Sequence, residues 1–173
     1  MTVASPSIRA YEARDLAACR DLWRELTQRH RDIYDDQTIG GDDPGTYFDE
    51  HLAKATCLET WVGELDGAVV AFYSLIGSEG AGELEIDPVV VHAEHRSRGI
   101  GRTLLAHAIE RCKERGAKSV SIRPVARNIE ALQLYHEVGF TKLGHIDMFM
   151  ELSARREGSW KSGVSIHGRK FDY

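Results

Sequence analysis

A short segment rich in arginine and glycine, residues 95–102 (HRSRGIGR), carries the residue types that bind a negatively charged group. It follows an apolar run at 83–91 and precedes an amphipathic pattern at 99–115, so it should connect a strand to the N-terminus of a helix. Backbone N–H groups at a helix N-terminus and arginine side chains both bind phosphate. Gly99 and Gly101 lack a Cβ atom and would let the backbone approach a pyrophosphate closely. The segment therefore predicts a phosphate-binding loop.

Two other phosphate motifs do not fit this segment. The dinucleotide fingerprint Gly-x-Gly-x-x-Gly would need a glycine at position 104, where the chain has Leu104, and no Lys-Ser or Lys-Thr pair directly follows Gly101 as in a P-loop. The remaining alternative is a glycine-containing turn that only caps the following helix. The segment alone does not decide between a binding loop and such a turn.

Three acidic residues alternate along the expected strand at 83–91. Side chains at every second position of a strand share a face, so Glu83, Glu85 and Asp87 should point the same way. A carboxylate on this face is suited to accept a proton as a general base. The alternative is a solvated strand face without a chemical role.

Hydrophobic periodicity and turn residues place these segments in a mixed α/β order, β-α-α-β-β-β-α-β-α-β. Asp15 is placed to cap the first helix, and Asp66-Gly67 is the strongest hairpin signal in the chain. The fourth helix would begin at Asn128 and end at Gly139. The expected strands are 7–11, 60–65, 68–76, 83–91, 118–122 and 141–151, and the expected helices begin near residues 16, 46, 99 and 128.

Composition narrows the class of protein. The chain has 173 residues, of which 42% are hydrophobic and 28% charged, as expected for one globular domain. The net charge of −5 argues against binding nucleic acid by phosphate neutralisation. No apolar run reaches the roughly 18 residues of a membrane span and no signal peptide is visible, so we expect a cytoplasmic protein without a membrane partner. Its cysteines and histidines show no metal-ligand spacing, so no metal site is expected.

Two blocks of the chain together resemble the GNAT superfamily of acetyltransferases. The acetyl-CoA motif of that family, Arg/Gln-x-x-Gly-x-Gly/Ala, stands here at 96–101, and the family's second block stands as Asn128, Tyr135 and Gly139-Phe140 in the same order. The likeness covers about residues 8–152 and is strongest from 83 to 140. It implies a GNAT fold, with a central, mostly antiparallel sheet splayed between the strands at 83–91 and 118–122 and flanked by helices.

The resemblance also implies a cofactor and roles for individual residues. Acetyl-CoA would be the acetyl donor, with its pantetheine arm in the splay and its pyrophosphate on the loop. Tyr135 would protonate the leaving thiolate, although a buried core tyrosine is the alternative, and Glu85 falls where some family members have a glutamate base. Arg123 stands where some N-terminal acetyltransferases have a second glutamate, which weakens transfer of their mechanism. The implied cofactor-binding residues are Val89, Val90, Val91, Arg96, Ser97, Arg98, Gly99, Ile100, Gly101, Arg102, Thr103, Asn128 and Tyr135.

The implied reaction is direct transfer of an acetyl group to an amine acceptor. Six carboxylates lie between the first and second helices or enter the second, and they tilt the expectation toward a cationic acceptor, such as a small amine or a protein lysine or N-terminus. A solvated charge run is their alternative explanation. The six are Asp35, Asp36, Asp42, Asp43, Asp49 and Glu50. A second hypothesis of another class is a non-catalytic acyl-CoA-binding sensor or interaction module.

The last residues extend beyond the resemblance. We therefore expect a GNAT acetyltransferase domain at 1–158 and a C-terminal extension at 159–173. The extension contains Trp160, Phe171 and Tyr173, and such an aromatic content is typical of a segment that docks, either on its own domain beside the acceptor cleft or across a homodimer interface. GNAT proteins often dimerise, so a homodimer is a candidate assembly. A mobile terminus is the alternative.

Overall fold

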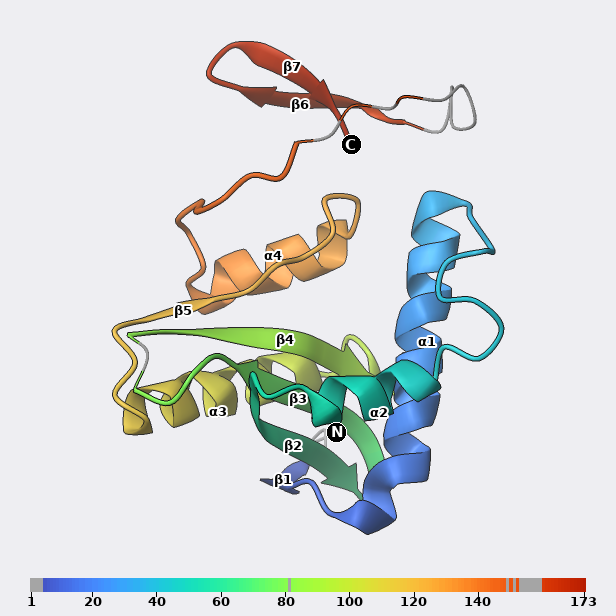
Figure 1. Cartoon of the computed structure of the whole chain (residues 1–173), viewed down its shortest axis with the longest axis vertical. Helices are drawn as coiled ribbons and strands as arrows, with labels where there is room; N and C mark the ends of the chain where they lie inside the picture. Colours follow the sequence, from blue (N-terminus) through green and yellow to red (C-terminus); the bar gives the residue numbers. More distant parts are fainter. Residues whose placement is uncertain (1–4, 81, 149, 151, 153–159) are drawn as a thin grey trace.

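The computed structural model describes residues 5–80, 82–148, 150, 152 and 160–173, and the structural statements below concern these residues. A five-stranded sheet in the order β1-β2-β3-β4-β5 forms the centre (Figure 1). Neighbouring strands are antiparallel except β4 and β5, which are parallel. The mixed, mainly antiparallel fold class expected from the sequence is confirmed. The strands are β1 (Ser7–Ala10), β2 (Cys57–Leu65), β3 (Ala68–Ile76), β4 (Glu83–Val91) and β5 (Ser119–Ser121).

Helices cover both faces of this sheet. On one face, α1 (Leu16–Tyr34) and α2 (Thr46–Ala53) bury Cys19, Leu22 and Phe48 against β2, β3 and β4. On the other, α3 (Ile100–Glu114) buries an apolar row that includes Leu104, Leu105 and Cys112. The helix α4 (Ile129–Val138) packs three side chains, Leu134, Tyr135 and Val138, against this second core. Two layers of helices thus hold the sheet from either side.

Two local predictions can be compared with the structure. Asp66 and Gly67 have φ values of 50° and 80°, the left-handed pair that a two-residue hairpin turn requires, so the predicted hairpin is confirmed. Asp15 occupies the N-cap position of α1 but does not cap it with its side chain. Its carboxylate instead accepts hydrogen bonds from the Arg9 guanidinium at 2.7 and 2.8 Å and from the Glu12 amide at 2.9 Å. A charged donor with two aligned N–H groups outcompetes the helix end for this carboxylate.

The sheet is open between β4 and β5. The two strands pair at only three positions, from Glu83↔Ser119 to Glu85↔Ser121. Beyond Glu85, no described residue of β5 pairs with β4, so the outer edge of β4 continues to Val91 without a neighbouring strand. On the other side of β4, the pairing with β3 is irregular between Tyr73 and Leu75. This arrangement is the splay expected of the fold.

The strand expected at 141–151 is wrong for the part of it that the structure describes. Residues 141–148 and 150 form no strand, and four large apolar side chains among them are exposed. Leu143 is 84% exposed and Met150 is 81% exposed. An alternating pattern shows which side chains a strand would bury, but a strand also needs a hydrogen-bonding partner. Residues 149 and 151 of the expected strand lie outside the described residues.

The extension forms a hairpin of its own. Strands β6 (Ser162–Ile166) and β7 (Arg169–Asp172) make a separate two-stranded antiparallel sheet above α4 and the C-terminal end of α1 (Figure 1). Its turn, His167-Gly168, has φ values of 49° and 75°. Neither strand was expected from the sequence. Among the described residues, no helix is long and apolar enough to cross a membrane.

Candidate active site

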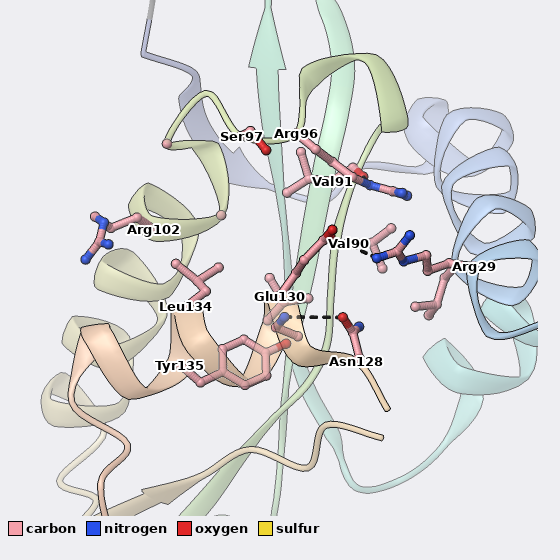
Figure 2. Close-up of a pocket in the computed structure, with 15 residues that line it drawn as sticks. Arg29, Val90, Val91, Arg96, Ser97, Arg102, Asn128, Glu130, Leu134 and Tyr135 are labelled. Carbon is pink, nitrogen blue, oxygen red and sulfur yellow. Dashed lines mark hydrogen bonds and ion pairs between the residues drawn. The ribbon is translucent and has the colours of Figure 1, made fainter. Parts of the chain in front are cut away.

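A cavity of about 360 Å³ lies where the sheet opens. Its walls come from the C-terminal half of β4, the loop that follows, the first turn of α3, the helix α4 and the middle of α1 (Figure 2). Its lining residues are Leu26, Arg29, Val89, Val90, Val91, Arg96, Ser97, Gly99, Gly101, Arg102, Asn128, Glu130, Ala131, Leu134 and Tyr135. The structure thus brings the two blocks of the sequence together around one cavity.

The loop between β4 and α3 curls back toward the end of the strand. Arg96 donates from Nε to the carbonyl oxygen of Val91 at 3.0 Å. Ser97 and Gly99 have φ values of 58° and 84°, so the backbone turns through the left-handed region twice within three residues. Glycine adopts that conformation at no steric cost, whereas serine does so rarely. The tight turn leaves the first N–H groups of α3 at the cavity.

Gly101 is needed for the contact between two helices. A Cβ atom at this position would lie 3.1 Å from Cδ2 of Leu134 on α4 and 3.9 Å from Cγ2 of Val91. The sequence suggested that Gly101 lets the backbone approach a ligand; in the structure it also lets α3 and α4 approach each other. The width of the cavity therefore depends on this glycine.

Three of the predicted cofactor residues do not line the cavity. Ile100 is 1% exposed and belongs to the core beneath α3. Thr103 donates its hydroxyl to the carbonyl oxygen of Gly99 at 3.2 Å. Arg98 is not among the lining residues. The positions of Ile100 and Thr103 follow from the helix itself, because residues of the first turn point to different sides of the axis, whereas Arg98 lies in the loop before the helix. The other predicted cofactor residues all line the cavity.

Some lining residues were missed by sequence reasoning. Leu26 and Arg29 come from α1, and no pattern in the sequence indicates that α1 lies beside the loop at 95–102. Arg29 forms an ion pair at 2.9 Å with Glu130 on α4, so the two helices meet beside the cavity (Figure 2). Ala131 and Leu134 belong to the apolar row predicted for α4. That row was the sequence feature that could have placed them at the cavity.

The arginines of the loop have carboxylate neighbours. Arg102 pairs with Glu137 of α4 at 2.5 Å, and Arg96 lies 3.7 Å from Glu25 of α1. These ion pairs are exposed or half-exposed, where salt bridges contribute little and exchange readily. The arginines therefore remain available to an anion. The N-terminus of α3 adds backbone N–H donors, because its N-cap residue, Gly99, makes no side-chain capping hydrogen bond.

Asn128 and Tyr135 lie on α4, toward the end of the cavity away from Arg96 and Ser97 (Figure 2). The side-chain oxygen of Asn128 accepts a hydrogen bond from the Ala131 amide at 3.2 Å and caps the helix, which leaves the side-chain NH₂ group for a ligand. Burial, and secondarily the charge of Asp87, raises the pKa of Tyr135 to about 12. Tyr135 is therefore a neutral phenol at physiological pH and can donate a proton.

Glu85 is partly buried and pairs with Arg123 at 2.9 Å. Burial raises the pKa of Glu85, the Arg123 guanidinium opposes that shift, and the neighbouring carboxylates of Asp87 and Glu83 add to it. A raised pKa makes a carboxylate a stronger base. Arg123, seen in the sequence as a departure from the family pattern, is thus the ion-pair partner of the candidate base.

Asp87 is a second carboxylate on the same strand. It is exposed, and within the described part of the chain it forms no ion pair. The negative charge of Asp87 adds to the raised pKa of Tyr135. Burial lowers the pKa of His51, and the charge of Asp87 partly offsets that shift. The His51 imidazole on α2 is buried and its Nε2 has no hydrogen-bond partner among the described residues. The sequence placed Asp87 on the acidic face without giving it a role.

The acidic stretch before and within α2 is partly neutralised. Asp49 pairs with Arg20 at 2.7 Å and Asp43 pairs with Arg24 at 3.0 Å, so both carboxylates bind arginines of α1. Two of the six carboxylates thus tie α2 and the preceding loop to α1. Their charge is less available to a substrate than the sequence suggested.

The residues around the cavity suit acetyl-CoA. The free N-terminal amides of α3 and the loop arginines suit a pyrophosphate, and Gly99 leaves open space where a Cβ atom would project. The unpaired edge of β4 offers backbone donors and acceptors to an extended arm that contains amides. The described residues contain no group of three or more histidine, cysteine, aspartate or glutamate side chains that could hold a metal ion.

Comparisons with known proteins give a consistent result. A family model described as "Acetyltransferase (GNAT) family" matches residues 17–140. An uncharacterised N-acetyltransferase of Bacillus subtilis, YvbK, is 26% identical over 140 residues, which cover 81% of this chain and 87% of that protein. The L-amino acid N-acyltransferase MnaT of Escherichia coli is 28% identical over 139 residues, covering 78% of each chain.

Solved structures share the fold at low sequence identity. A GNAT-family acetyltransferase from Staphylococcus aureus superposes with a TM-score of 0.66 at 16% identity, over 83% of this chain and 89% of that one. AAC(6')-Iy, solved in complex with the bisubstrate analog CoA-S-monomethyl-acetylneamine, superposes with a TM-score of 0.64 at 16% identity, over 86% of this chain and 99% of that one.

Proposed function

The chain belongs to the GNAT acetyltransferase family, and from this premise we propose that it transfers the acetyl group of acetyl-CoA directly to the nitrogen of an amine acceptor. The single observation that carries the proposal is the open edge of β4 beside the phosphate loop. One cavity there combines anion-binding groups at one end with a neutral phenol at the other. This is the combination that thioester aminolysis needs.

The proposed chemistry assigns one task to each part of the site. The α3 N-terminus and the loop arginines bind the pyrophosphate of acetyl-CoA, and the edge of β4 binds its arm. A carboxylate on β4, Glu85 or Asp87, accepts the proton of the acceptor ammonium directly or through water. The free nitrogen then forms a bond to the acetyl carbonyl carbon, and a backbone N–H of β4 stabilises the negative charge that develops on the oxygen.

Tyr135 completes the reaction in this proposal. When the carbon–sulfur bond breaks, the electron pair stays on sulfur, and the phenol of Tyr135 donates a proton to that thiolate. The nitrogen gives its second proton to solvent as the amide forms, and the Tyr135 phenolate takes up a proton from solvent. No residue forms a covalent bond with the acetyl group, because the nitrogen attacks the thioester directly.

We propose that the acceptor is a primary amine that arrives as an ammonium ion. The exposed carboxylate of Asp87 forms no ion pair among the described residues and gives the acceptor side negative charge, which favours a cation, whereas the charge of Glu85 is offset by Arg123. The acidic stretch adds less to this preference than its composition suggests, because Asp43 and Asp49 are paired with arginines. An α-amino group, as in the acceptors for which the E. coli relative is named, and a lysine side chain both fit this description.

Thiol release from acetyl-CoA in the presence of an amine panel tests the proposal. The panel should contain neutral amino acids, a polyamine, an aminoglycoside and a lysine-containing peptide, with mass spectrometry of the products. We expect an acetylated amine and an equal amount of free CoA. Binding of acetyl-CoA without thiol release on any amine would contradict the proposal and favour the non-catalytic acyl-CoA sensor.

A further inference from the structure

One arginine connects the C-terminal hairpin to the domain. The guanidinium carbon of Arg127 lies 4.9 Å from the ring centroid of Tyr34 and 5.4 Å from that of Trp160. Its Nε donates to the carbonyl oxygen of Tyr173 at 2.7 Å. Tyr34 is the last residue of α1, Trp160 precedes β6, and Tyr173 follows β7. We call these four residues the Arg127 clamp.

The clamp holds the hairpin at its base. Lys161 and Tyr173 exchange backbone hydrogen bonds of 3.0 and 2.8 Å, which close the two strands at the end where Arg127 binds. An isolated two-stranded hairpin is only marginally stable in water. Its position on the domain therefore depends on contacts such as this clamp, in which a half-buried guanidinium lies over two aromatic rings.

The clamp lies beside one particular end of the cavity. Arg127 directly precedes Asn128, which lines the cavity together with Tyr135 at the end away from Arg96 and Ser97 (Figure 2). The phosphate-binding groups occupy the opposite end, so the acetyl group would lie near Asn128 and Tyr135. The segment that carries Arg127 therefore borders the end of the cavity at which an acceptor would meet the acetyl group.

We propose that the C-terminal hairpin forms the outer wall of the acceptor entrance, and that Arg127 and Trp160 are the positioning residues that hold this wall in place. The inference rests on the proposed acetyltransferase function, because an acceptor entrance exists only if an acceptor binds. It gives the extension at 159–173 a role in acceptor selection rather than in acetyl-CoA binding.

The hairpin has one apolar face and one polar face, which suits a segment that covers an entrance on one side and meets solvent on the other. Val164 pairs with Phe171 across the strands, and both are half-buried, as is Ile166. Lys170, which alternates with Phe171 along β7, is exposed. Side chains alternate between the faces of a strand, so an apolar face and a polar face follow. A wall of this kind excludes water on one side and remains soluble on the other.

The test compares clamp variants with a matched arginine variant. Arg127→Ala and Trp160→Ala remove the clamp, whereas Trp160→Phe keeps an aromatic ring for the guanidinium. Arg14→Ala is the control, because Arg14 forms an exposed ion pair with Glu12 just before the first residue of α1. The 19 residues of α1 separate it from Tyr34 by about 28 Å along the helix. The assays are steady-state kinetics with the best amine of the panel, calorimetric affinity for acetyl-CoA, and hydrogen exchange of the peptide at 160–173.

We expect the two alanine variants to raise the acceptor KM by about 3- to 10-fold, the range of one partly exposed cation–π contact. Acetyl-CoA affinity should stay within about twofold, as for a substitution away from the bound group. Exchange at 160–173 should accelerate, and Trp160→Phe should restore most of the acceptor KM. The control should change none of the three.

Two results would overturn the inference. An acceptor KM in Arg127→Ala equal to that of Arg14→Ala shows that the hairpin is not a wall of the entrance, whether or not hydrogen exchange accelerates. Equal losses of acceptor and acetyl-CoA binding show a general structural role instead. Failure of the proposed function itself would appear earlier, as absence of acetyl transfer by the wild-type chain, and the inference would fall with it.

Discussion

Asn128 has two tasks that can be separated by substitution. Its side-chain oxygen caps α4 by accepting from the Ala131 amide at 3.2 Å, and its side chain also lines the cavity. In our assignment the side-chain NH₂ group donates to acetyl-CoA. Asn128→Asp keeps an acceptor for the cap but has no N–H donor, whereas Asn128→Ala loses both groups.

The magnitudes follow from the contacts. Asn128→Asp should retain the free energy of unfolding, because aspartate caps helices as well as asparagine does. Its acetyl-CoA affinity should fall about 2- to 12-fold, which corresponds to one hydrogen bond of about 0.5–1.5 kcal/mol. Asn128→Ala should lose similar affinity and also about 1 kcal/mol of stability through the lost cap, which lowers the melting temperature by about 2–4 °C in a chain of this size.

Calorimetric titration with acetyl-CoA and thermal denaturation without ligand measure the two tasks independently. If Asn128→Asp bound acetyl-CoA with wild-type affinity, the side-chain donor would play no part in binding and the assignment of Asn128 would be wrong. An unchanged melting temperature in Asn128→Ala would show that the cap does not limit the stability of the domain.

Other substitutions test the remaining parts of the site. Gly101→Val should weaken acetyl-CoA binding in a folded protein, because even its Cβ would lie 3.1 Å from Leu134; unchanged affinity in calorimetry would contradict the loop assignment. Tyr135→Phe should lower turnover by about 10²–10⁴-fold with acetyl-CoA affinity kept, as for loss of a general acid, and full turnover would place the proton donor elsewhere. Burial raises the pKa of Glu85, so a Glu85 base should lose activity as the pH falls through a value above that of an ordinary carboxyl. Under that assignment Glu85→Gln should lower activity and remove this acid limb, with the largest loss at pH values above the Glu85 pKa at which free amine is still scarce, and Asp87→Asn should leave the acid limb in place; the reverse pattern in pH–rate profiles would identify Asp87 as the base.

The sequence predicted the conformation of the loop between β4 and α3 well, because its cause is local. Glycines at 99 and 101, arginines around them and a helix directly after them specify a loop without reference to distant residues. Turn geometry is equally local, as the hairpin at Asp66-Gly67 shows. The second local turn, His167-Gly168, was available from its glycine and the flanking alternation but was not recognised.

Features that depend on distant segments were predicted less well. The segment at 141–151 was predicted to be a strand, yet its described residues have no pairing partner. Arg29 and Leu26 reach the cavity because α1 packs across the sheet toward α4, and no pattern within α1 encodes that neighbour. The same applies to Asp43 and Asp49, whose arginine partners lie on another helix.

From the open sheet we expect two units of unequal stability. Strands β2, β3 and β4 are joined along longer ladders, whereas β5 is joined to β4 by three residue pairs, and α4 follows β5. Opening of the smaller unit breaks few backbone hydrogen bonds, so amides between residues 119 and 138 should exchange before those of the central strands. A ligand that bridges the edge of β4 and the start of α4 would couple the two units, and its binding would then register as slower exchange on both sides of the gap.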